Sequence, residues 1–119
     1  MRGALDARMA RHGEQFTYLL ADVVMLDYEG AAELADELVD EPPLGRPLPE
    51  DRESLNAMLP AAFFDYQDQL RARATALGQA ARAKDRAQLV ATFGNLAETC
   101  VACHAAYLND ELPVHAEEP

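Results

Sequence analysis

The sequence lacks tryptophan and isoleucine, and its 119 residues include only two cysteines and three histidines. The absence of isoleucine beside abundant Ala, Leu and Glu favours helix over sheet. Two cysteines three residues apart argue against a disulfide framework. No apolar run reaches eighteen residues, so no membrane span is predicted. Residues 1–30 contain no apolar leader, and an exported form would have lost its leader before this numbering begins.

Basic residues are also scarce: the sequence has ten Lys and Arg against twenty-one Asp and Glu, which gives a formal net charge of −11. This balance argues against nucleic acid and anionic membranes as partners. It fits either a solvated acidic surface or attraction to a basic patch on a partner protein. The length predicts one domain with a modest core, which we assign to residues 1–112. Residues 113–119 read as a frayed acidic tail.

Four segments carry a helical period. The first predicts a helix over about 2–28, in which Gly13 is tolerated and after which Gly30 makes a break. A shorter helix then runs to about Asp40, with Leu34 and Leu38 inward. The inward residues of the first helix alternate in steps of four and three, as in a helix bundle: Leu5, Met9, His12, Phe16, Leu19, Val23 and Leu26.

Residues 41–49 hold four prolines and a glycine and cannot continue a helix, whereas 50–59 fit either a turn or a short helix. A third helix is predicted from Pro60 to about Ala83, and a fourth after an N-cap at Asp85. The fold class is therefore all-α. We expect an antiparallel, up-down-up-down four-helix bundle with a long proline-rich crossover between helices 2 and 3. The inward residues of these two helices are Phe63, Gln67, Leu70, Ala74, Leu77 and Ala81, then Leu89, Phe93, Leu96, Cys100, Cys103 and Tyr107.

Residues 100–104 read Cys-Val-Ala-Cys-His, the C-x-x-C-H pattern of c-type haem attachment. Thiols three residues apart can reach the two vinyl groups on one edge of the macrocycle and form thioethers, while His104 gives its imidazole to the iron. A redox dithiol would instead open a helix in a βαβ context. A structural zinc site needs about four ligands, and only His12 or His115 could complete the three in the motif. A helical zinc or thiol-containing interaction module, or two inert core cysteines, are the alternatives.

The opposite side of the iron has its own candidates. In an antiparallel bundle the start of the first helix lies beside the end of the fourth, so His12 and His104 stand at comparable levels, roughly 15 and 8 Å from those helix ends. His12 lies on the inward seam and is a candidate distal ligand, and Met9, one turn earlier, is a second. The third possibility is a hydrogen-bonded core histidine beside an open iron site.

A C-x-x-C-H motif near the end of the last of four helices resembles the class II c-type cytochromes, the cytochrome c′ group. Tyr107 matches the aromatic residue that often follows the histidine by three positions, whereas Leu108 departs from the basic residue that commonly comes next. The resemblance implies one haem c and export to the periplasm. It also implies either a six-coordinate electron carrier or a five-coordinate protein that binds nitric oxide or carbon monoxide, and it suggests a homodimer. It suggests that Arg8 or Arg11 pairs with a haem propionate, with an ordinary surface charge as the alternative.

Phe16, Phe93, Leu96 and Tyr107 would supply apolar contacts to the haem, although such residues at helical spacing also fit plain core. No Ser-His-Asp set or poised carboxylate pair stands out, so we expect no enzyme. The function expected from the sequence is one-electron transfer to a redox protein with a basic docking patch.

Overall fold

The computed structural model describes residues 2–42 and 60–106, with side chains from Ala7 onward. Within these ranges the chain forms four helices and no strand: α1 (Arg2–Val24), α2 (Tyr28–Asp40), α3 (Ala61–Arg82) and α4 (Arg86–His104). The predicted all-α class is confirmed. No helix in the described part is long and apolar enough to cross a membrane. The predicted crossover beyond Pro42, Tyr107 and the acidic tail lie outside these ranges.

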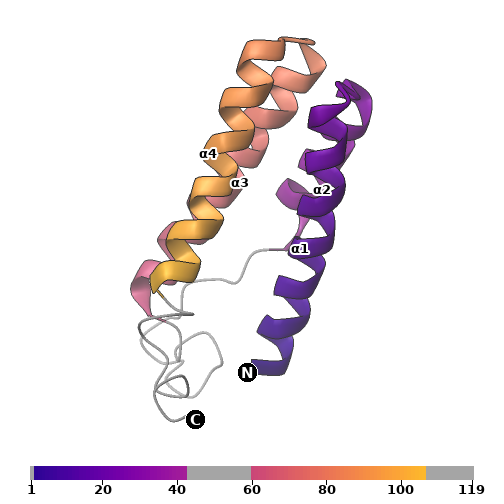
Figure 1. The fold of residues 1–119 in the computed structure, drawn as a ribbon. Coiled ribbons are helices and arrows are strands. Elements are labelled where there is room, and N and C mark those ends of the chain that lie inside the picture. The colour runs from indigo at the N-terminus through magenta and orange to yellow at the C-terminus, as the bar shows by residue number, and fades with distance from the viewer. Residues whose placement is uncertain (1, 43–59, 107–119) are drawn as a thin grey trace.

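Helices that follow one another along the chain pack side by side and run in opposite directions (Figure 1). Arg8 of α1 meets Glu41 at the end of α2, and Arg82 near the end of α3 pairs with Asp36 of α2. Contacts are most extensive between α2 and α3 and between α3 and α4, and are sparse between α1 and α4. The start of α1 and the end of α4 therefore lie at the same end of the bundle.

All four helices contribute to the core. Leu19, Leu77, Leu89 and Leu96 are fully buried at its centre. The α2 side is lined by Ala31, Ala32 and Ala35, small residues that allow α3 to approach closely. Helix α2 ends at Asp40 with Leu38 buried, as predicted, and the α3 residues Ala74, Leu77 and Ala81 face inward as their spacing indicated.

The turn between α1 and α2 differs from the prediction. Helix α1 ends at Val24 rather than near residue 28, and Gly30 lies inside α2 rather than at the break. The side chain of Asp27 caps α2 by accepting from the Gly30 N–H at 3.0 Å, and Leu26 closes the turn with a φ of 56°. Leu26 is 43% exposed, so its predicted place on the inward seam was wrong. Gly30 instead leaves room for the carboxylates of Asp22 and Asp27, which lie 2.8 Å or less from where a Cβ would stand.

Two other local predictions are confirmed. The side chain of Asp85 accepts a hydrogen bond from the Gln88 N–H at 3.0 Å and so caps α4. Gly13 lies within α1, and nothing stands within 4 Å of where its side chain would be. Because α4 begins at this cap, the C-x-x-C-H motif falls in its last two turns.

Candidate functional site

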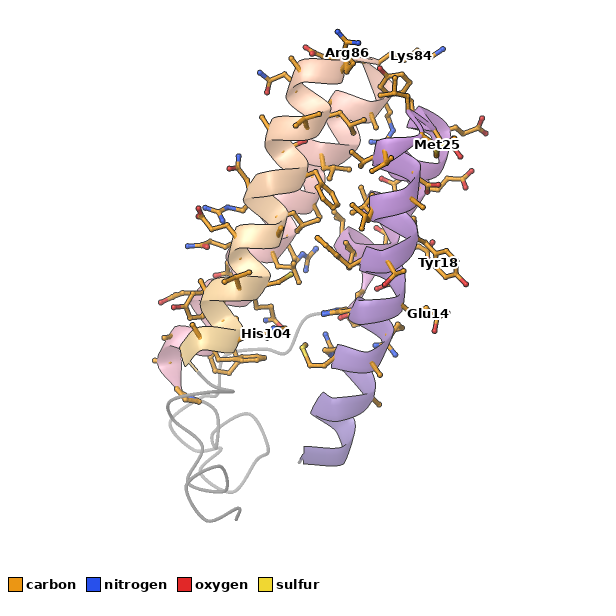
Figure 2. All side chains as sticks on the ribbon, viewed as in Figure 1. Glu14, Tyr18, Met25, Lys84, Arg86 and His104 are labelled. Carbon is orange, nitrogen blue, oxygen red and sulfur yellow. The ribbon has the colours of Figure 1, made fainter. Side chains whose placement is uncertain are left out.

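Helix α4 carries the motif at its C-terminal end. Cys103 lies three residues and His104 four residues after Cys100, so helical geometry places all three on one side of α4. Both cysteines are free and half-buried, whereas His104 is exposed and is the last residue of the helix (Figure 2). Two thiols and an imidazole on one side of a helix match what covalent haem attachment needs.

The two thiols are held in their neutral form. Burial raises the pKa of Cys100, against a smaller lowering by a hydrogen bond to its own backbone. Burial also raises the pKa of Cys103, and the neighbouring Cys100 raises it further. At neutral pH both therefore remain S–H groups. When a thiol adds to a vinyl group, its sulfur bonds to one vinyl carbon and its hydrogen to the other.

The inward residues of α1 and α4 are less buried near the motif than farther from it, although Leu96 and Thr99 are buried. On α1 the inward residues Leu19 and Val23 are buried, but Met9, His12 and Phe16 are only half-buried. On α4 Leu89 is buried, whereas both cysteines are not. These inward positions keep exposed apolar surface that a flat apolar group could cover, on the side where α1 and α4 make few contacts. The residues present therefore fit a haem.

The predicted apolar haem contacts divide into two kinds. Phe16 of α1 and Phe93 of α4 stack with ring centroids 4.9 Å apart and an interplanar angle of 23°, and both are half-buried. Leu96 is fully buried within the hydrophobic core. The aromatic pair is thus partly exposed between α1 and α4, whereas Leu96 belongs to the core.

The candidate distal residues of α1 meet a carboxylate. His12 Nε2 lies 2.8 Å from Glu41 Oε1, and its side chain is 17% exposed. The guanidinium of Arg8 donates to the same oxygen at 2.7 Å, and Arg11 Nε donates to Glu41 Oε2 at 3.4 Å. Both arginines proposed for a propionate therefore contact Glu41 in this structure. The bond to Glu41 uses only one of the five N–H donors of Arg8, so it does not exclude a further bond to a propionate. The pairing of Arg8 with a propionate stays a prediction.

A second polar contact, absent from the sequence prediction, lies just before the motif. Arg73 of α3 donates through Nη1 to the hydroxyl of Thr99 at 2.7 Å and to the carbonyl oxygen of Asn95 at 2.8 Å. Thr99 is 3% exposed and immediately precedes Cys100. The only hint in the sequence was that Thr99 follows the inward Leu96 by three residues. Glu41 gave no such hint, because it opens the proline-rich segment.

The zinc alternative finds no support in the part of the chain that the structure describes. Within residues 2–42 and 60–106, no three His, Cys, Asp or Glu side chains gather closely enough to hold a metal ion. His115, one of the two residues proposed to complete such a site, and Tyr107 lie outside those ranges.

Comparison with known proteins agrees with this site. The family model described as Cytochrome C' matches residues 58–108, which include α3, α4 and the whole C-x-x-C-H motif. No curated protein and no solved structure gives a significant match. In a c-type cytochrome the haem iron supplies the chemistry by taking up and releasing one electron. The match covers less than half of the chain, and it shows that α3, α4 and the C-x-x-C-H motif are similar to cytochrome c′, a haem c protein.

Proposed function

We propose that this chain is a cytochrome c′-like c-type cytochrome that acts as a periplasmic one-electron carrier and not as an enzyme, with His104 as proximal and His12 as distal ligand of a single haem. The observation that carries the proposal is the position of His12. It lies on the inward seam of α1, half-buried, at the end of the bundle that holds Cys100 and Cys103. Two firm axial ligands keep the coordination of the iron unchanged on reduction, as a carrier requires.

The helix register supports this pairing. Phe16 of α1 stacks on Phe93 of α4. Because the two helices are antiparallel, His12, four residues before Phe16, is level with Ala97, four residues after Phe93. His104 then lies roughly 10 Å further along α4. Side chains lean toward the N-terminus of their own helix. The side chain of His104 therefore points back toward the level of Cys100. The side chain of His12 points toward the level of Met9, and the same register places Met9 opposite Cys100. This register would bring the two imidazoles toward a common level along the bundle, which supports the proposed pair of ligands.

The surface charge suits a basic redox partner. Glu33, Asp36, Glu37 and Asp40 are exposed along α2, in a chain whose formal net charge is −11. Such a field steers a positively charged partner at low ionic strength and weakens as salt is added. The periplasm is proposed because c-type haem attachment occurs there in bacteria of the resembling group. A homodimer is proposed on the exposed apolar side chains Leu20, Val24 and Met25 near the end of α1.

A second candidate function is binding of a small gas such as nitric oxide or carbon monoxide. The observation in its favour is that His12 Nε2 faces Glu41. If the imidazole that Glu41 holds does not reach the iron with its other ring nitrogen, the iron is left open, or bound by the half-buried Met9. The two functions therefore differ in what occupies the distal side.

The test is the ultraviolet–visible spectrum of the haem-loaded protein, ferric and then reduced, before and after carbon monoxide. Sharp low-spin ferrous bands that carbon monoxide leaves unchanged support the carrier. His12→Ala should abolish those bands, whereas Met9→Ala, one turn away on the same seam, should not. A broad high-spin spectrum that shifts with carbon monoxide would replace the carrier by the gas-binding protein. Loss of the bands in Met9→Ala alone would make Met9 the distal ligand.

A further inference from the structure

We propose that Glu41 is a positioning residue for the distal ligand: its carboxylate orients His12 and strengthens the bond of that imidazole to the iron. This inference rests on the proposed function, in which His12 is an axial ligand. It concerns the C-cap residue of α2, which lies outside both the C-x-x-C-H motif and the inward seam of α1.

The backbone holds Glu41 in place. It is the C-cap residue of α2, with an extended backbone (φ −60°, ψ 127°), and its N–H donates to the Glu37 carbonyl oxygen at 3.1 Å. Its side chain is only 10% exposed, although it is a carboxylate at the end of a helix. A buried carboxylate needs hydrogen-bond donors around it. Here Arg8, Arg11 and His12, all from α1, provide them.

The chemistry of these partners fixes the proton on His12. An ionised carboxylate can only accept hydrogen bonds, so the 2.8 Å contact requires the proton on the Nε2 that faces Glu41. A neutral imidazole then carries its lone pair on the opposite ring nitrogen, which is the form a metal binds. Arg8 on the same Oε1 and Arg11 on Oε2 keep the carboxylate from turning away. Glu41 thus selects the tautomer of His12 that would bind iron through Nδ1.

A hydrogen bond from a ligating histidine to a carboxylate also makes the imidazole a stronger donor to the metal. Stronger donation stabilises ferric over ferrous iron and therefore lowers the reduction potential. It also makes His12 harder to displace by an incoming gas. Loss of such a partner typically costs 10- to 100-fold in metal affinity, and we expect a change of about that size for the bond between His12 and the iron.

The experiment compares Glu41→Gln with Glu37→Gln in the haem-loaded protein. Both substitutions remove one negative charge from α2, and Glu37 is exposed one turn before Glu41. We expect Glu41→Gln to raise the reduction potential and to increase the equilibrium affinity for carbon monoxide about tenfold or more. Glu37→Gln should leave carbon monoxide binding unchanged and alter the potential only slightly, in a salt-dependent way.

A third measurement does not use ligand binding at all. In the reduced, low-spin protein, the ring N–H proton of His12 should be visible by NMR and protected from exchange with water. In Glu41→Gln its exchange should quicken and its resonance should move, whereas in Glu37→Gln it should match the wild type. Denaturant unfolding of each variant establishes that the bundle is intact.

Two outcomes would overturn the inference, and they differ in meaning. If His12→Ala abolishes the low-spin spectrum but Glu41→Gln behaves like Glu37→Gln, His12 is the ligand and Glu41 does not position it. If His12→Ala leaves the low-spin spectrum unchanged, the proposed distal ligation is wrong, and the role of Glu41 falls with it.

Discussion

The contact between Arg73 and Thr99 gives a prediction that can be worked through from the structure. Arg73→Ala removes the Nη1 that donates to Thr99 at 2.7 Å, to Asn95 at 2.8 Å and to Glu98 at 3.2 Å. Hydrogen bonds that involve a charged group contribute about 1.5–3 kcal/mol. All three acceptors share one nitrogen, so their contributions do not add.

Burial decides where in that range the effect should fall. The Arg73 side chain is 29% exposed, which favours the lower end, and Glu98 is 70% exposed, so its ion pair contributes about 0–1 kcal/mol. Thr99 keeps a longer bond to the Asn95 carbonyl at 3.4 Å, so the substitution leaves no buried hydroxyl without a partner. We expect Arg73→Ala to lower the free energy of unfolding by about 1.5 kcal/mol.

The assay is urea unfolding of the haem-loaded protein, followed by circular dichroism. Glu98→Gln isolates the exposed ion pair and should cost less than about 0.5 kcal/mol. A double-mutant cycle with Thr99→Val isolates the buried bond and should give a coupling of about 1 kcal/mol. The reasoning would be refuted by an Arg73→Ala variant no less stable than Glu98→Gln, or by a coupling near zero.

Three further substitutions test the fold. Leu77→Ala leaves a cavity at a fully buried position and should destabilise the protein by about 2–5 kcal/mol, measured by urea unfolding, whereas Leu20→Ala on the exposed face of α1 should cost far less. Asp85→Ala removes the N-cap bond to Gln88 and should cost about 0.5–2 kcal/mol, with Asp85→Asn restoring most of it. Burial, and to a smaller extent the neighbouring Asp27, raise the pKa of Asp22 above its ordinary 3.8. The folded protein is therefore most stable while Asp22 is protonated, and it loses that stability as pH rises through the raised pKa. Asp22→Asn should thus stabilise the folded protein at pH 7. Unfolding at pH 7 and near pH 3 checks this, since the gain should vanish at the lower pH; a gain that is equal at both would contradict it.

The sequence by itself predicted most of the helices and the motif that we expect to attach the haem. Apolar residues at steps of three and four make one face of a helix hydrophobic wherever the chain folds, so the end of α2, both ends of α3 and the start of α4 were predictable within about two residues. Asp85 caps α4 through a bond to its own near neighbours, which is also a local property. The motif from Cys100 to His104 is contiguous, and its spacing on a helix is set by the backbone alone.

Only the tertiary structure decided which side chains from different helices meet. The contact between His12 and Glu41 spans 29 residues of sequence and that between Arg73 and Thr99 spans 26, and neither leaves a period in the chain. The turn at Leu26 was missed because a glycine four residues later was the stronger local signal for a break, while the Asp27 cap and the approach of Asp22 fixed the turn earlier. Helix period tells which face of each helix is buried, but the rotation and level of one helix against another come from packing four helices together. That packing places a carboxylate of α2 against a histidine of α1.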